Sequence, residues 1–143
     1  MNDNIIFRSF KKGDYEVCCK WWKWWWKHNR QDPVRRAFLP KDERCFIIEK
    51  NGIPIACYFL FIMEPHIVGW ATYLVSNPEY KEKDRRELIK LLIQNVEKEA
   101  EKIGIMQLFT VCGDKHMSNI HDSLDWIMVP VEHEGFKYLT NNF

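Results

Sequence analysis

The sequence lacks a long apolar run and an N-terminal targeting segment. Its longest apolar stretch, Ile53–Met63, is interrupted by Pro54 and is far shorter than the ~18 residues that a membrane-spanning helix needs. The first residues, Met1–Asn4, lack the basic start of a signal peptide, and the apolar stretch after them is too short for one. We therefore expect a cytoplasmic protein that does not cross a membrane.

Glycine is scarce, and the cysteines follow no framework. None of the six glycines is clustered, which excludes Walker-type phosphate loops and the glycine motifs of dinucleotide-binding proteins. The five cysteines are odd in number and irregular in spacing, so reduced thiols are the simplest interpretation. Cys112, His116 and His121 match no zinc-module spacing, and we expect no metal.

A strong excess of charge of either sign is also missing. The formal net charge is +1 over 143 residues, so no global field draws the chain to nucleic acid. Hydrophobic residues make up 46% and charged residues 29%, which is ordinary for a globular protein. This length suits one domain with a proper core, and we expect a single domain over residues 1–143.

Tryptophan, by contrast, is abundant, and five of the seven indoles fall between Trp21 and Trp26. We expect a helix from Asp14, as its N-cap, to about Lys27. On a helical wheel the indoles belong to one apolar arc roughly 200° wide, whereas packing on one sheet needs little more than ~100°. Some indoles should therefore be partly exposed. Core packing, a surface for an acceptor or partner, and stacking on nucleobases are the alternatives.

The remaining pattern predicts strands and helices in alternation. Asn51-Gly52 supplies the two positive φ angles of a type I′ turn, so the flanking segments form a hairpin. Apolar residues recur every three or four positions from Leu88 to Ile103, and Gly104 ends this amphipathic helix. The helix joins two parallel strands. The expected strands are 5–10, 45–49, 53–63, 66–75, 105–112 and 135–139, with further helices within 34–38 and 117–128.

This order of elements resembles the GNAT superfamily of N-acetyltransferases over essentially the whole chain. Three motifs carry the resemblance: the hairpin Phe46–Ala56, the run Leu74-Val75-Ser76-Asn77-Pro78-Glu79-Tyr80-Lys81, and the pair Gly135-Phe136. The Trp pair of the first helix and the glycine-free connector are similar to a GNAT-like group met in bacteriophage genomes. The resemblance implies an α/β (α+β) domain, with a mixed central sheet of about six strands flanked by helices.

The connector after the fourth strand departs from the family. The family's acyl-CoA loop has an Arg or Gln followed by two glycine positions. The equivalent residues here are Lys81, then Asp84 and Arg86, so both glycines are absent. In one interpretation, cationic side chains bind the coenzyme phosphates in place of backbone amides; these are Lys81, Lys83, Arg85 and Arg86. In the other, Asn77 and Pro78 start a solvated helical turn that holds no ligand. Asp84 would place a negative charge near a phosphate.

The resemblance also implies how a thioester would be held. The family draws the backbone N–H groups for the thioester oxygen from the fourth strand, here near Leu74 and Val75. Glu64 and Tyr73 are the catalytic candidates, because Glu64 follows the third strand near the cleft and can act as a base, and Tyr73 lies near the thioester. Trp22 and Trp26 are candidates for the wall of the acceptor site.

The family's proton-donating Tyr, on the helix before Gly-Phe, has no counterpart between Lys115 and Glu134. His133 or Tyr138 would have to replace it, and neither matches the usual place.

Taken together, these features predict acyl transfer from acetyl-CoA to an amine acceptor, a small molecule or a protein. The alternative is a GNAT-fold binding protein that does not catalyse and uses the Trp-rich helix to hold a partner. Coenzyme binding requires the fourth and fifth strands to part, with open space between Val75 and Cys112. A homodimer is compatible with the sequence.

Overall fold

The computed structural model describes residues 3–27, 31–130, 135 and 137–140. Its centre is a five-stranded sheet with the strand order β1-β2-β3-β4-β5. Neighbouring strands are antiparallel, except that β4 and β5 are parallel. The strands are β1 (Ile5–Ser9), β2 (Cys45–Lys50), β3 (Ile53–Met63), β4 (Val68–Ser76) and β5 (Gln107–Phe109).

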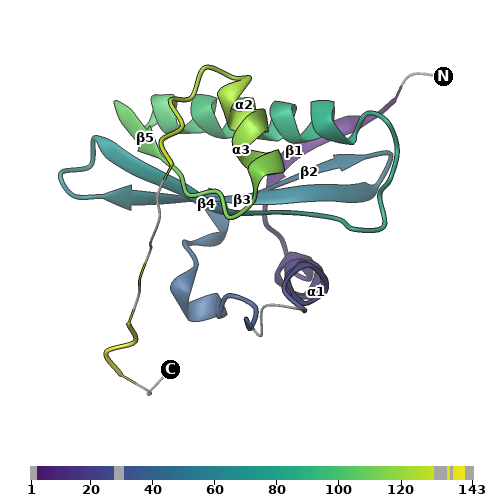
Figure 1. Ribbon diagram of the computed structural model, residues 1–143, viewed down its shortest axis with the longest axis horizontal. Helices are drawn as coiled ribbons and strands as arrows, with labels where there is room; N and C mark the ends of the chain where they lie inside the picture. The colour runs from purple at the N-terminus through teal and green to yellow at the C-terminus, as the bar shows by residue number, and fades with distance from the viewer. Residues whose placement is uncertain (1–2, 28–30, 131–134, 136, 141–143) are drawn as a thin grey trace.

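Helices cover both faces of the sheet (Figure 1). One face carries α2 (Arg85–Lys102) and α3 (Lys115–Asp122), and the other carries α1 (Asp14–Trp25) with two short 3-10 helices, η1 (Arg36–Phe38) and η2 (Asp42–Arg44). Two apolar clusters fill the space between the sheet and the helices of each face. The predicted mixed α/β sheet flanked by helices is confirmed.

The β2–β3 hairpin forms as the sequence predicts. Asn51 has a φ of 52° and Gly52 a φ of 80°, the two positive angles that a type I′ turn needs. Lys50 pairs with Ile53 across the turn. Both strands are largely buried, because α2 covers one face of this hairpin and α1 the other.

The first helix forms on the predicted residues, but Asp14 is not its N-cap. Gly13, with a φ of 98°, occupies that position, and Asp14 is the first helical residue. The Asp14 carboxylate instead accepts the Lys11 N–H at 2.7 Å and a guanidinium N–H of Arg8 at 2.6 Å. This carboxylate therefore ties the start of α1 to β1, which only the folded chain brings beside it.

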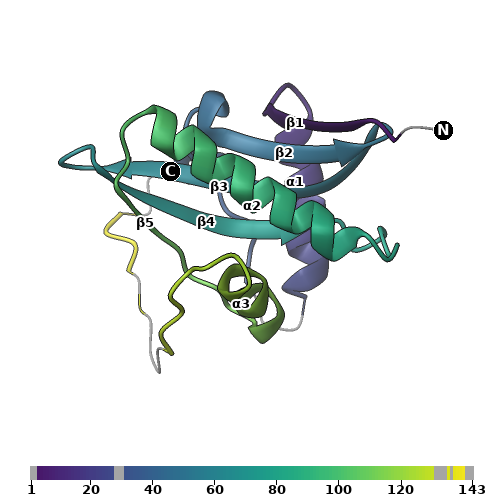
Figure 2. The ribbon, with the colours of Figure 1, turned by 90° about the horizontal axis from the view of Figure 1, so that it is seen from above.

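The amphipathic helix α2 follows the predicted periodicity. Its buried residues are Leu88, Ile89, Leu92, Ile93, Val96 and Ala100. Gly104 follows with a φ of 91°, a left-handed conformation that favours glycine after a helix. Figure 2 shows α2 lying across the sheet, with α3 beside β4 and β5.

The C-terminal third departs from the prediction. The expected sixth strand at 135–139 is wrong for the described residues there, Gly135 and 137–139, which belong to no strand; Phe136 lies outside the described residues. Tyr138 stacks on Phe38 of η1 at 5.8 Å between ring centroids, so this stretch contacts η1. The third helix also starts two residues earlier than predicted, because Asp114 caps it by accepting the Met117 N–H.

Candidate functional site

The strands β4 and β5 part in the middle of β4. Their parallel pairing consists of Val68 with Gln107, Gly69 with Leu108, and Trp70 with Phe109. Beyond this point β5 ends, whereas β4 continues to Ser76. The predicted parting of these strands before Val75 and Cys112 is therefore confirmed. Ligands commonly bind at the carboxyl ends of parallel strands that diverge in this way.

A bulge distorts β4 within the parted segment. The register with β3 shifts between the pairs Phe59–Thr72 and Cys57–Val75, which leaves Tyr73 and Leu74 together opposite one residue of β3. Tyr73 has a φ of 58°, which is rare outside glycine. The backbone of β4 thus changes direction at the predicted thioester position, beside Leu74 and Val75. Strain of this kind often accompanies a functional site.

The connector from Asn77 to Asp84 is mostly not helical. The Asn77 side chain accepts the Glu79 N–H at 2.9 Å, and the Asn77 carbonyl accepts the Tyr80 N–H at 3.2 Å. This forms one turn after Pro78, and α2 begins only at Arg85. A second turn precedes α2, because the Arg85 N–H donates to the Glu82 carbonyl at 3.2 Å. The connector thus consists of two turns, one of them at the predicted Pro78, and not of a continuous helix.

Asp84 does not present an unpaired charge to the site. Its carboxylate pairs with the Lys50 ammonium and accepts the Tyr80 hydroxyl at 2.6 Å. The hydrogen bonds from Lys50 and Tyr80 hold the pKa of Asp84 below its usual value. Lys50 comes from β2, so this ion pair joins residues distant in sequence. The Lys50 charge offsets the repulsion that Asp84 was expected to exert on a phosphate.

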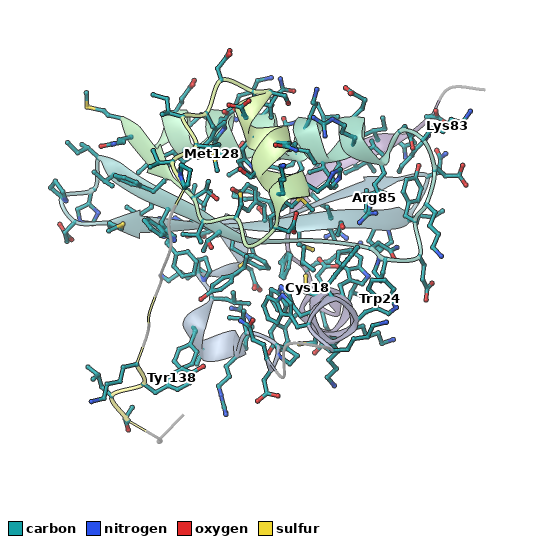
Figure 3. The ribbon with its side chains drawn as sticks, in the orientation of Figure 1. Cys18, Trp24, Lys83, Arg85, Met128 and Tyr138 are labelled. Atoms are coloured by element: carbon teal, nitrogen blue, oxygen red, sulfur yellow. The ribbon has the colours of Figure 1, made fainter. Side chains whose placement is uncertain are left out.

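Arg85 lies further inward than Lys83 (Figure 3). Its guanidinium hydrogen-bonds the Ser76 hydroxyl at the end of β4 and lies 5.3 Å from the centroid of the Trp25 ring. The Trp25 indole N–H donates to the Ser76 carbonyl at 2.7 Å. The Arg85 Nε is buried and has no hydrogen-bond partner among the described residues. Arg85 therefore lies between α1, α2 and the open end of β4, and its Nε–H makes no hydrogen bond with the described residues.

The other predicted cations surround the same helix start. Lys81 and Lys83 are exposed on the connector, and Arg86 is half-buried in the first turn of α2. Figure 3 shows Lys83 pointing outward, away from Arg85. The first N–H groups of an α-helix have no partner within the helix and carry partial positive charge. This end of the molecule thus combines amide donors with four cationic side chains.

A buried polar cluster, which the sequence did not reveal, lies beyond the end of β5. The Tyr58 hydroxyl lies 2.8 Å from both Thr110 Oγ1 and His121 Nε2. His121 Nδ1 lies 2.8 Å from the Met117 carbonyl, which can only accept, so Nδ1 carries the proton and Nε2 accepts from Tyr58. Burial lowers the pKa of His121, and the Met117 carbonyl opposes this only in part. The sequence placed His121 only in a weak metal pattern.

Comparison with known proteins matches the fold but not the sequence. No protein-family model and no curated protein matches the sequence. A GCN5-related N-acetyltransferase (GNAT) from Ralstonia eutropha matches with a TM-score of 0.67 at 17% identity, over 96% of this chain and 100% of that chain. An aminoglycoside N-acetyltransferase in complex with CoA matches with a TM-score of 0.66 at 14% identity, over 99% and 97%. The chain has the GNAT fold.

A longer protein shares this fold in part. N-acetylglutamate synthase from Neisseria gonorrhoeae, in complex with coenzyme A and N-acetyl-glutamate, matches with a TM-score of 0.67 at 16% identity. The match covers 85% of this chain and 28% of the synthase, so this chain spans little more than a quarter of that protein. The common part is the GNAT fold.

The GNAT fold does not bring all predicted residues together. Glu64 lies at the turn between β3 and β4, exposed and paired with His66. Val68, at that end of β4, and Tyr73, at the bulge, are five positions apart, which is about 16 Å along a strand. Glu64 therefore lies far from the open end of β4, because a strand fixes the separation of its ends.

The two predicted wall tryptophans differ in their surroundings. Trp22 is 0% exposed, and it stacks on Trp26 at 5.8 Å between ring centroids. The Trp22 Nε1 has no hydrogen-bond partner among the described residues. Trp26 is half-buried, whereas Trp24 and Trp25 are exposed. The prediction that only some of the indoles are exposed is confirmed. Trp22, which was predicted to line the acceptor site, is fully buried.

Of the two proton-donor candidates, the structure describes only Tyr138, which stacks on Phe38 of η1. His133 lies outside the described residues. A hollow of about 480 Å³ lies between the β2–β3 turn and the connector, and its lining includes Lys50, Tyr80, Lys83 and Asp84. Among the described residues, no group of three or more His, Cys, Asp or Glu side chains could hold a metal ion. In the same part of the chain, every helix is too short or too polar to cross a bilayer.

Proposed function

We propose that this protein is an acyl-CoA-dependent N-acyltransferase that transfers an acetyl group from acetyl-CoA to a primary amine. The observation that carries the proposal is the parting of β4 from β5 beside the start of α2. The gap between the strands would receive the pantetheine arm, and the helix start would receive the diphosphate. Solved structures of two proteins with this fold contain coenzyme A.

Side chains take over part of the role that glycines have in the family's loop. Glycine lets the backbone approach a phosphate closely, and this connector has none. Arg85 and Arg86 stand in the first turn of α2, where a guanidinium can bind a phosphate through two parallel hydrogen bonds. Lys81 and Lys83 add positive charge on the exposed side. Asp84 is paired with Lys50 and opposes binding less than an unpaired carboxylate would.

The bulge in β4 supplies the second part of the proposed site. A backbone N–H near Leu74 or Val75, on the edge of β4 that β5 has left, would donate to the thioester oxygen and stabilise the oxyanion. Tyr73, at the bulge, would contact the acyl group. Glu64 is left out of this proposal because of its distance along β4.

The proposed reaction is a direct displacement. The amine nitrogen attacks the thioester carbonyl carbon, a C–N bond forms, and the C–S bond breaks. The amine loses one proton and the CoA thiolate gains one, so the products are an N-acetyl amine and CoA with a free thiol. The base for the amine proton is not among the residues assigned above.

The test is titration of the full chain with acetyl-CoA by calorimetry. We expect micromolar binding that weakens as salt rises, because exposed charges are screened. Arg85→Ala and Arg86→Ala should each weaken binding about tenfold, since a hydrogen bond to a charged group contributes roughly 1.5–3 kcal/mol.

Lys98→Ala is the matched control, because Lys98 is an exposed cation in the C-terminal half of α2, away from the helix start. It should leave the affinity unchanged. If millimolar acetyl-CoA gives neither heat nor a thermal shift with the folded protein, the transferase proposal is wrong and the binding-protein alternative remains.

A further inference from the structure

An aromatic strip runs along the α1 face of the sheet, next to the bulge. Phe61 of β3 lies directly opposite Trp70 of β4, so both side chains share one face. Trp70 stacks on Phe109 of β5 at 5.6 Å between ring centroids, and Phe61 contacts Tyr73 at 6.2 Å. We define the strip as Phe61, Trp70, Tyr73 and Phe109. Tyr73 also contacts the buried Trp22 at 6.5 Å, which fixes it to the core.

All four residues of the strip are partly exposed. Tyr73 is 36% exposed and Phe109 39% exposed, and Phe61 and Trp70 are half-buried. The strip crosses three neighbouring strands, a width of about 10 Å at the usual strand spacing. That width suits a body of one or two fused rings. Since Tyr73 belongs to both the bulge and the strip, a ring lying on the strip would stand next to the proposed acyl group.

The strip itself offers no ion pair to a polycation. None of the four strip residues is charged, and the acid nearest to them in sequence, Glu64, lies past the end of β3 and is paired with His66. A second ammonium group on a ligand would therefore gain no salt bridge from the strip, whereas a flat ring can stack on its side chains.

We infer that the acceptor is a primary amine carried on a flat aromatic body, and that the strip holds this body. The inference rests on the proposed acetyl transfer and names the substrate class of the same site. Aromatic pairs contribute about 0.5–1.5 kcal/mol each beyond the area that they bury. One body stacked on two or three rings would therefore be selected over an aliphatic amine of similar size.

The test compares four amines at a fixed concentration of acetyl-CoA. Phenethylamine and tryptamine represent the inferred class, and spermidine and kanamycin represent polycations. The rate is the release of CoA thiol, measured with a thiol-reactive dye. We expect kcat/KM for the aryl amines to exceed that for either polycation at least tenfold.

Two strip variants locate the binding site. Phe109→Ala and Trp70→Ala should each raise KM for tryptamine about tenfold and change kcat less than twofold, and Phe109→Trp should retain the wild-type KM. Ile127→Ala is the control, because Ile127 is 92% exposed and lies after α3, away from the strip. It should leave both constants unchanged.

The outcomes separate this inference from the proposed function. Preferred acetylation of spermidine or kanamycin, or an unchanged KM for tryptamine in Phe109→Ala, overturns the inference while the transfer itself stands. Binding of acetyl-CoA without thiol release from any of the four amines also overturns the inference, and leaves the coenzyme site. Absence of both binding and release overturns the inference together with the proposed function.

Discussion

His121 illustrates how burial determines the chemistry of a single side chain. It is fully buried, it donates from Nδ1 to the Met117 carbonyl, and it accepts from the Tyr58 hydroxyl. Burial lowers its pKa below the ordinary value of 6.5, so the native protein holds it neutral where the unfolded chain would protonate it. The stability that this contributes is present above about pH 6.5 and is lost as pH falls through the native pKa.

We therefore expect the free energy of unfolding to fall as pH is lowered from 7 to 5, and His121→Gln to flatten this dependence. One differential proton changes stability by at most about 1.4 kcal/mol per pH unit. Urea denaturation at pH 7, 6 and 5 measures the slope. His116→Gln, an exposed histidine on the same helix, should keep the wild-type slope. An unchanged slope in His121→Gln would show that another group is responsible.

The residue scale also explains which of the predicted site residues the structure places near one another. Leu74 and Val75 lie at the end of β4, Arg85 and Arg86 begin α2, and one short connector joins these elements. Asp84 was misjudged because its partner, Lys50, is distant in sequence. Glu64 was placed near the cleft from its position after a strand, and the length of β4 separates it from Tyr73.

At the scale of elements, α2 links stability and the proposed coenzyme site. Its N-terminus stands at the open end of β4, and its C-terminus is closed by Gly104 with a φ of 91°. No atom lies within 4 Å of the Cβ that an alanine would add there, so a substitution at Gly104 would act through the backbone alone.

Gly104→Ala should lower the free energy of unfolding by about 1 kcal/mol, because alanine disfavours a left-handed conformation. Chemical denaturation checks this. Gly113→Ala is the matched control, since it also has open space around its Cβ but lacks a positive φ. It should leave stability unchanged or raise it slightly. Equal losses in both variants would contradict the conformational argument.

At the scale of the whole molecule, acetyl-CoA would bridge the end of β4 and the segment after β5, which are not paired with each other. Acetyl-CoA in the gap would contact the end of β4, the start of α2 and the residues after β5. The strands β1 and β2 lie at the opposite edge of the sheet. Binding of acetyl-CoA should therefore affect the β4 side of the molecule and leave β1 and β2 largely unchanged.

Hydrogen exchange with and without acetyl-CoA tests this directly. We expect amide exchange in Leu74–Ser76 and Arg86–Leu88 to slow about tenfold or more at saturating ligand, with little change in β1 and β2. Raising the salt to about 1 M, where the screening length is about 3 Å, should reduce the protection. Protection confined to the β2–β3 turn, beside the hollow lined by Lys50 and Tyr80, would place the ligand elsewhere.

The fold was largely predictable, because each element has a local cause. The Asn51-Gly52 turn fixed the hairpin, the apolar spacing from Leu88 fixed α2, and Gly104 ended it. The region after β5 was less predictable: α3 starts earlier than its apolar spacing indicated, and the described residues of 135–139 form no strand. Short segments of this kind depend on the surfaces they contact, such as Phe38 for Tyr138.

The sequence by itself determined the mixed sheet, the Trp-bearing helix and the gathering of cations after Asn77, since these follow from turns, periodicity and neighbours along the chain. Only the tertiary structure decided that β4 bulges at Tyr73 and leaves β5 after Trp70, that Lys50 neutralises Asp84, that Trp22 is hidden, and that Phe61, Trp70, Tyr73 and Phe109 share one face. The physical reason is that pairing, burial and charge neutralisation join residues distant in sequence, and their energies exist only once the chain has folded.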